Sequence, residues 1–259
     1  MPLPAPTATP LWNSWVKVCP APVSKMNFAI GMGSSVSNVG GWDLVLGGGV
    51  SRYPEGNTND VYGYKAATDS WSTLPPMLNS FRGASTAVYQ DNLYVFGGYD
   101  QAVRDTAYVY APGTSTWSQK SPTPNAFQTA AGMGAVSSKI YIAGGKDSTN
   151  SLMSTLVAYD IATDAYDTLL PDMPSGARYY GAGVTVGSTF YVIGGEGPTG
   201  SVATAEAFTV ATSSWTVLAP MPDTGKNAIA AQFDGTIYAG QVDQTIWAYD
   251  IATDAWSNP

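Results

Sequence analysis

Short runs of apolar residues recur along the chain, and each leads into glycine before the sequence becomes polar again. Val, Ile, Leu, Phe and Tyr dominate the runs, and the flanking segments are rich in Gly, Pro, Asn and Asp, which favours β-strands separated by turns. Five runs share this form: 44–48, 93–98, 140–145, 190–195 and a degenerate copy at 237–241. With the first glycine placed at 47, 97, 144, 194 and 240, the steps are 50, 47, 50 and 46 residues, which predicts an internal repeat.

An aromatic residue follows each run, and a proline cluster follows the aromatic. The aromatics are Trp71, Trp117, Tyr166, Trp215 and Trp256, with an additional Trp15 ahead of the first. The hexamer at 160–165 recurs identically at 250–255. Each unit therefore predicts four short strands: a small-residue strand such as 84–88, the apolar strand, a Tyr-containing strand such as 107–110, and a strand that carries the aromatic marker.

These markers, repeated in one order from about Trp15 to Trp256, resemble the kelch repeat. The resemblance implies an all-β fold, a kelch-type β-propeller in which each repeat is one four-stranded blade around a central channel. It also implies that the paired glycines let the strand bend where no side chain fits, and that the Trp and Tyr markers pack between adjacent blades. The fifth copy departs from the pattern, with Gln241 in place of its second glycine.

Five glycine-containing copies predict five blades, with six as the alternative, since six aromatics at the Trp position leave one outer strand over. We expect a proline-rich lead-in at 1–10 and one propeller domain at 11–259, with blades at about 16–71, 72–117, 118–166, 167–215 and 216–256. The surplus strand at 11–18 is predicted either to add to the outer strand of the last blade or to replace it, because closing a ring removes its open edges.

Composition removes several functional classes. The 259 residues carry a net charge of −8 and a pI near 4.3, which excludes the basic surface that nucleic acid needs. Without histidine, the chain lacks Ser-His-Asp triads and the histidine-ligated metal sites of metal-dependent kelch-type enzymes, so no cofactor is expected. No signal peptide or membrane-spanning run is visible, so we expect no membrane partner and favour the cytoplasm.

All four arginines fall in the loops that enter the small-residue strand or follow the glycines, together with several aromatics. Arg and aromatic side chains are the residues that most often anchor interfaces. The predicted binding residues are Arg52, Tyr53, Phe81, Arg82, Tyr99, Asp100, Arg104, Phe127, Gln128, Arg178, Tyr179, Tyr180, Glu196 and Asn227. The alternative is that these arginines make structural hydrogen bonds within the loops.

A carboxylate also follows the glycines in four units: Asp100, Asp147, Glu196 and Asp243. Such a set suits a hard cation or acid–base work on a sugar, but a turn residue that bonds its own backbone explains it more simply.

Two functions stay open. The first is a non-catalytic recognition module that binds a protein segment, a peptide or a small polar ligand such as a sugar over the channel. The second is a histidine-free enzyme or lectin acting on a sugar or other small molecule through Arg, Tyr and carboxylates. Convergence of Arg82, Arg178 and a carboxylate would favour the enzyme, whereas exposed Phe127, Tyr179 and Tyr180 would favour recognition.

Overall fold

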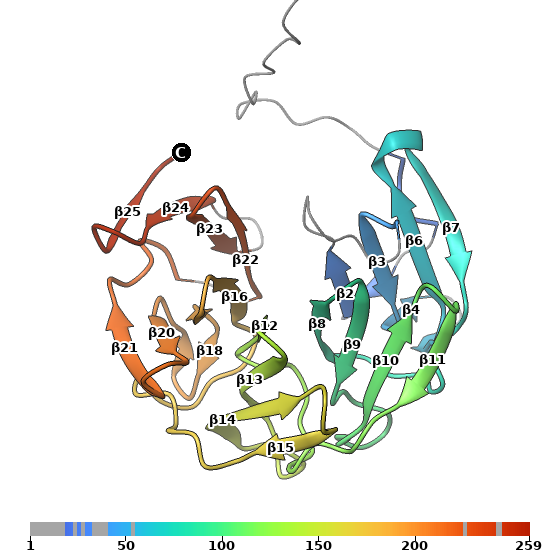
Figure 1. Cartoon of the computed structure of the whole chain (residues 1–259), viewed down its shortest axis with the longest axis horizontal. Coiled ribbons are helices and arrows are strands. Elements are labelled where there is room, and N and C mark those ends of the chain that lie inside the picture. The colour runs from blue at the N-terminus through green and yellow to red at the C-terminus, as the bar shows by residue number, and fades with distance from the viewer. Residues whose placement is uncertain are drawn as a thin grey trace, which may run out of the picture.

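The chain folds into five four-stranded antiparallel blades arranged in an arc around a central channel (Figure 1). The computed structural model describes residues 19–22, 25–26, 29–32, 41–52, 55–224, 227–241 and 245–259. The all-β kelch-type propeller and its five blades are thus confirmed. The predicted lead-in at 1–10 and the predicted strand at 11–18 lie outside the described residues.

Within each blade the strands pair in chain order from the channel outwards. Blade 1 contains β2 (Ala29–Met32), β3 (Leu44–Gly47), β6 (Val61–Lys65) and β7 (Ser70–Leu74). Blade 2 contains β8 (Ser85–Tyr89), β9 (Asn92–Phe96), β10 (Ala107–Ala111) and β11 (Thr116–Gln119). Blade 3 contains β12 (Gly132–Val136), β13 (Lys139–Lys146), β14 (Leu152–Asp160) and β15 (Ala165–Asp167).

Blade 4 contains β16 (Ala182–Val186), β17 (Thr189–Ile193), β20 (Ala205–Thr209) and β21 (Ser214–Leu218). Blade 5 contains β22 (Ala228–Phe233), β23 (Thr236–Gln241), β24 (Trp247–Asp250) and β25 (Ala255–Ser257), so its outer strand is its own. Two small sheets decorate the loops: β1 (Lys25–Met26) with β4 (Val50–Arg52) and β5 (Glu55–Asn57), and β18 (Glu196–Gly197) with β19 (Gly200–Ser201). Among the described residues the one helix is the 3-10 turn η1 (Ala66–Thr68), so none of them forms a helix that could cross a bilayer.

The strand register corrects the predicted glycine alignment at both ends of the arc. Leu93 pairs with Tyr110 and lies four residues before Gly97, whereas Leu44 pairs with Tyr64 and lies four residues before Gly48. The glycine pair of blade 1 is therefore 48–49 and not 47–48. In blade 5, Ile237 pairs with Tyr249, so Gln241 takes the place of the first glycine and not of the second. Counting glycines alone hid this shift, because Gly47 and Gly240 happen to precede the true positions.

The glycine pairs of blades 1, 2 and 3 connect each of these blades to the next one. Both glycines have positive φ, for example 61° at Gly144 and 113° at Gly145. This conformation is costly for any residue with a Cβ atom. The second glycine donates its N–H to a carbonyl at the entrance of the following blade: Gly49 to Phe81 (2.9 Å), Gly98 to Phe127 (2.8 Å) and Gly145 to Arg178 (2.9 Å).

Four apolar cores lie between consecutive blades. In the third, Tyr141 and Ala143 of blade 3 pack against Phe190 and Phe208 of blade 4, with the Tyr141 ring centred 5.6 Å from that of Phe208. Because side chains alternate along a strand, each blade offers one apolar face to the blade before it and one to the blade after it. The core of this protein is thus a series of blade interfaces.

The aromatic marker fastens each outer strand to the segment that leaves the preceding blade. Its polar group donates to a backbone carbonyl there: Trp71 to Cys19 (3.0 Å), Trp117 to Pro75 (2.9 Å), Tyr166 to Ser121 (2.9 Å), Trp215 to Pro171 (2.8 Å) and Trp256 to Ala219 (2.8 Å). This confirms that the markers pack between blades, and it explains the residue type, since a half-buried indole or phenol packs its ring on apolar neighbours while its polar atom needs a partner.

In blades 1, 3 and 5 a Tyr–Asp pair reinforces this attachment. The Tyr64 hydroxyl donates to Asp69 (2.8 Å), whose carboxylate also accepts the Cys19 N–H (2.7 Å), and the same arrangement joins Tyr159, Asp164 and Ser121. The hydrogen bond to Asp69 is the main cause that raises the pKa of Tyr64, to about 12. The Cys19 N–H, followed by Tyr64, holds the pKa of Asp69 below its usual value. At Asp164 burial pushes the pKa upwards, but the bonds from Tyr159 and Ser121 outweigh it, and the pKa is lowered.

These carboxylates predict an acid-sensitive fold. A folded-state pKa below the unfolded value contributes stability that is complete above about pH 4 and is lost as pH falls through the folded pKa. We expect the melting temperature to fall steeply between about pH 4 and pH 2, and the double variant Asp69→Asn, Asp164→Asn to show a flatter acid limb. Thermal melts followed by circular dichroism across this range test it; identical acid limbs would contradict the assignment.

Candidate functional site at the channel mouth

The mouth of the channel is hollowed by a cavity of about 480 Å³. The inner strands β8, β12, β16 and β22 and the residues just before them line it, and most of these residues are small: Gly83, Ala84, Ser85, Thr86, Thr129, Ala130, Gly132, Met133, Tyr180, Gly181, Gly183, Asn227, Ala228 and Ile229. Small residues are required there because the inner strands converge. A Cβ atom on Gly183, for instance, would overlap the backbone of Met133.

Four of these lining residues occupy the same position in the entering loops of blades 2 to 5. In blades 2, 3 and 4 this position comes two residues after Phe81, Phe127 and Arg178. All have left-handed backbone: Gly83 (φ 63°), Thr129 (φ 53°), Tyr180 (φ 55°) and Asn227 (φ 56°). Only the first is glycine. Asn tolerates this conformation, but it is unfavourable for Tyr and an outlier for a β-branched Thr. The mouth therefore carries two residues with strained backbone, Thr129 and Tyr180.

Beside the cavity, the entering loops of blades 2, 3 and 4 pair with the loop that follows the glycines of the same blade. Isolated bridges join Arg82 to Tyr99, Gln128 to Lys146, and Tyr179 to Glu196. The Arg82 guanidinium lies over the Tyr99 ring at 4.7 Å, and the Lys146 ammonium over the Tyr179 ring at 5.2 Å. These pairs place two cations on aromatic faces at the rim.

Tyr179 and Tyr180 form the largest aromatic element of the rim, with ring centroids 4.4 Å apart. Both side chains are half-buried. Burial first, and then the neighbouring Glu196 carboxylate and Tyr180, raises the pKa of Tyr179, so its hydroxyl stays protonated at neutral pH.

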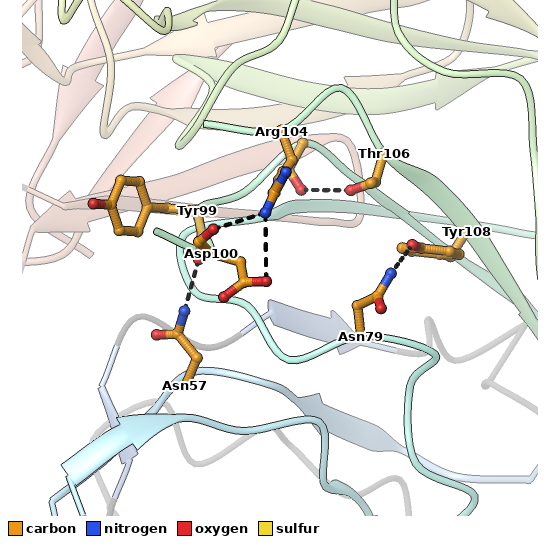
Figure 2. A network of polar contacts seen from close by, with 8 residues as sticks. Asn57, Asn79, Tyr99, Asp100, Arg104, Thr106 and Tyr108 are labelled. Carbon is orange, nitrogen blue, oxygen red and sulfur yellow. Dashed lines mark hydrogen bonds and ion pairs between the residues drawn. The ribbon is translucent and has the colours of Figure 1, made fainter. Parts of the chain in front are cut away.

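The loop at 99–104 is fixed by a polar network that reaches from blade 1 to blade 2 (Figure 2). The Asn57 amide donates to the Tyr99 carbonyl (2.9 Å), and Arg104 donates to the Asp100 carbonyl (3.0 Å) while its guanidinium lies 3.6 Å from the Asp100 carboxylate. Asp100 and Arg104 remain substantially exposed at the ends of this network. They are therefore available at the rim, but they also hold the loop together.

Three of the predicted binding residues lie inside the molecule instead. Phe81 and Phe127 are 2% and 3% exposed, and each packs in the core between its own blade and a neighbour. Arg178 takes the same position in blade 4 at 1% exposure, where it forms an ion pair with the buried Glu206 (2.6 Å). Arg178 thus points away from the rim, and Arg82, Arg178 and a carboxylate do not converge. The sequence could not separate them, since a core position and a rim position are one residue apart.

Of the remaining predicted binding residues, some lie at the mouth and others have side chains outside the described part of the structure. Gln128 and Asn227 lie at the mouth, Gln128 half-buried and Asn227 exposed. The backbone of Arg52 closes β4, but its side chain is not among the described ones, and Tyr53 lies outside the described residues. Sequence reasoning missed Thr129, Met133 and Ile229 as lining residues; the signal that identifies Thr129 is its spacing of two residues after Phe127, which matches that of Gly83 after Phe81.

Of the three described carboxylates that follow the glycines, Asp147 is a turn residue, whereas Asp100 faces Arg104 and Glu196 lies in β18. The Asp147 carboxylate accepts the N–H groups of Thr149 (2.8 Å) and Ser151 (2.9 Å) and the Thr149 hydroxyl (2.7 Å). The hydrogen bond from the Thr149 hydroxyl is the main cause that lowers the pKa of Asp147. Across the described part of the chain, no three carboxylate or cysteine side chains are arranged to hold a metal ion; Asp243 lies outside it.

Comparison with known proteins now decides the family. The model for the KLHDC2/KLHL20/DRC7 Kelch-repeats domain matches residues 83–259, more than half of the chain. The chain belongs to the kelch-repeat family. Its kelch relatives include Kelch-like protein terF of Aspergillus terreus, 29% identical over 251 residues that cover 89% of this chain and 51% of that protein. Kelch-like protein 36 of Bos taurus is 25% identical over 263 residues, covering 95% of this chain and 41% of that protein.

The matched region begins at the mouth of blade 2 and includes the kelch blades 2 to 5. The chain spans about half the length of terF and less than half the length of Kelch-like protein 36.

Proposed function

We propose that this kelch propeller is a recognition module that binds a protein or peptide segment at the channel mouth. Kelch-repeat propellers are generally protein-interaction modules, which agrees with this proposal. The segment lies across the rim formed by Arg82, Tyr99, Tyr179 and Tyr180, and one of its uncharged side chains enters the cavity.

The left-handed Thr129 and Tyr180 carry this proposal. Glycine at either position would remove an unfavourable conformation worth about 1–2 kcal/mol, as Gly83 does in blade 2. Strained residues of this kind cluster where a side chain has a use other than stability. Thr129 and Tyr180 both line the cavity, so the use that we assign to them is contact with the bound segment.

The rim and the cavity differ in chemistry, which sets the class of segment. The described cavity lining contains no charged side chain, so an inserted residue is small and uncharged or apolar. Around it, Arg82, Lys146 and the paired tyrosines offer cationic and aromatic contacts. A peptide with a short apolar or hydroxyl side chain flanked by acidic or aromatic residues matches both parts.

The triple variant Thr129→Gly, Tyr180→Gly, Asn227→Gly tests the site. Glycine accepts the backbone conformation at all three positions, so we expect an unchanged or slightly higher melting temperature. Peptides selected from a displayed random library against the unmodified chain should bind the variant roughly 10-fold more weakly or worse, because the lost contacts lie at the centre of the interface. Fluorescence anisotropy with the labelled peptides measures this.

The matched control places glycine at left-handed residues on the opposite end of the blades. Ser115, Ser137 and Ser213 have φ between 48° and 56° and lie in hairpins away from the mouth. Ser115→Gly, Ser137→Gly, Ser213→Gly should leave peptide affinity unchanged. Selected peptides that bind both triple variants like the unmodified chain would overturn the assignment of the mouth as the binding site.

A further inference from the structure

The linker that leaves blade 3 is one residue longer than the linkers that leave blades 1, 2 and 4. In those three blades, the residue whose carbonyl accepts the next aromatic marker comes four residues after the blade's own marker: Pro75 after Trp71, Ser121 after Trp117 and Ala219 after Trp215. In blade 3, Pro171 comes five residues after Tyr166. The outer strand β15 is also short, with three residues against five in β7 and β21. Residues 168–171 therefore form a bulge on the outer wall, where blade 3 leads into blade 4.

This bulge presents a leucine to solvent. Leu169 is 93% exposed, the highest value among the exposed large apolar side chains of the described residues. Its N–H donates to the Asp167 carboxylate (3.1 Å), a local turn that orders the start of the bulge. Beyond the bulge, the Asp172 carboxylate accepts the Ser154 hydroxyl (2.8 Å), which attaches the linker to β14. Because it is held at both ends, the bulge loses little conformational freedom when it binds a partner.

The flanks of the bulge are acidic. Asp167 precedes Leu169 by two residues and is half-buried, whereas Asp172 follows it by three residues and is exposed. The sequence contains no lysine or arginine between 147 and 177, so no nearby cation along the chain neutralises these carboxylates. The bulge is thus an exposed apolar side chain between two negative charges.

The channel mouth has the complementary chemistry. The described lining of its cavity, about 480 Å³, contains no charged side chain, and a cavity of this size holds a leucine side chain together with adjoining backbone. Arg82 and Lys146 lie in neighbouring loops beside it. These loops are joined because the Thr129 N–H donates to the Gly83 carbonyl (2.7 Å) and Gln128 forms a bridge with Lys146. The mouth therefore combines an uncharged cavity with two cations at one side.

The bulge cannot reach the mouth of its own chain. Figure 1 shows β15 on the outside of the arc and β12 at its centre, with β13 and β14 between them. Neighbouring strands lie about 4.8 Å apart, so three such spacings separate the bulge from the inner strand. The linker is also fixed at Met173, whose N–H donates to the Ser154 carbonyl (2.8 Å). Contact between the bulge and the mouth therefore requires two molecules.

We propose that the mouth of one molecule binds the bulge of a second copy of this chain. Leu169 enters the cavity, while Asp167 and Asp172 face Arg82 and Lys146 at the rim. This inference rests on the proposed function, because it names the segment that the mouth recognises. The two surfaces differ, so the contact is head-to-tail and can continue from copy to copy. Its small area places the dissociation constant on the order of 10 µM.

Sedimentation velocity of the unmodified chain tests the proposal over about 1–200 µM, a range that brackets this dissociation constant. The weight-average sedimentation coefficient should rise with concentration. Leu169→Asp should weaken the association roughly 10-fold or more, because it places a charge in the uncharged cavity. Its melting temperature should equal that of the unmodified chain, since the side chain is 93% exposed. The matched control Val217→Asp, at a 58% exposed residue of β21, should leave the association unchanged.

The mouth variant Thr129→Gly, Tyr180→Gly, Asn227→Gly should weaken the association to the same extent. A mixture of this variant with Leu169→Asp then gives the sharpest result. The first retains an intact bulge and the second an intact mouth, so an equimolar mixture should form a 1:1 dimer with the affinity of the unmodified chain and no larger species. An interface in which one patch meets itself would stay weakened in the mixture.

Three outcomes contradict the proposal. A chain that stays monomeric up to about 200 µM while library peptides bind its mouth would exclude self-recognition and leave the proposed function standing. Association that Phe233→Asp abolishes and Leu169→Asp does not would assign the contact to β22. A mixture of the bulge and mouth variants that stays monomeric would show that the two surfaces do not meet. Failure of the proposed function is seen separately, as selected peptides that bind the mouth variant and the unmodified chain equally.

Discussion

Gly144→Ala is expected to destabilise the protein by about 3 kcal/mol or more. The left-handed conformation at φ 61° costs a residue with a Cβ atom about 1–2 kcal/mol. In addition, that Cβ would lie 2.5 Å from the Arg178 carbonyl of the next blade and 2.9 Å from Ala131 and Met173 side-chain atoms. The blades would have to separate, so the loss exceeds that of backbone strain alone. Urea unfolding followed by tryptophan fluorescence measures the change.

Two other glycines separate the contributions. Gly187 has φ 57°, but no atom would meet its Cβ within 4 Å, so Gly187→Ala should cost only the conformational part, about 1–2 kcal/mol. Gly113 has neither a positive φ nor an atom within 4 Å of its added Cβ, so Gly113→Ala should change stability by less than about 0.5 kcal/mol. Equal effects of Gly144→Ala and Gly187→Ala would show that the glycine pair does not limit the approach of the next blade.

Glu206→Val is expected to destabilise the protein by about 3–5 kcal/mol, because it leaves the Arg178 guanidinium buried without its counter-charge. Glu206 is 0% exposed and Arg178 is 1% exposed, so water does not replace the lost partner. The Glu206 carboxylate also accepts the Ser175 N–H (2.5 Å), which the substitution leaves without that acceptor. Equilibrium unfolding in urea gives the free energy of unfolding.

The double variant Arg178→Phe, Glu206→Val should recover most of that loss, to within about 1–2 kcal/mol of the unmodified protein. It gives blade 4 the residues that blade 3 has at the same positions, Phe127 and Val157, which pack in an apolar core. A buried ion pair rarely contributes more than a well-packed apolar replacement. A double variant as unstable as the single one would show that the pair fixes blade 4 in a way that apolar packing does not.

Much of the fold can be predicted from the sequence because each marker residue of the repeat has one structural role in every blade. Trp117 and Trp215 predict the outer attachment since an indole needs both an apolar surface and an acceptor, and the attachment was found at each blade. The number of blades also follows from the copies. The glycine register did not, because Gly47 and Gly240 lie beside the true positions and only the ladder between strands distinguishes them.

The candidate site was predicted less well. Arg82 and Arg178 both fall in the entering loops, yet one covers a tyrosine ring at the rim and the other is buried beside Glu206. A shift of one residue along a strand turns a side chain to the opposite face. The sequence of a loop does not show which of its residues face the core and which face the rim. The residue type of Thr129 carries no chemical signature, and its one signal in the sequence is the spacing of two residues after Phe127, which matches that of Gly83 after Phe81.

Residue identity and spacing were enough to predict the all-β repeat, the family resemblance, the five blades and the absence of histidine chemistry. Contacts between blades were needed to show which loop residues face the channel mouth, that Arg178 neutralises Glu206 inside blade 4, and that Ile229 and Phe233 are more than half exposed. Such properties depend on what the neighbouring blade places against each side chain, and that neighbour is about fifty residues away in the chain.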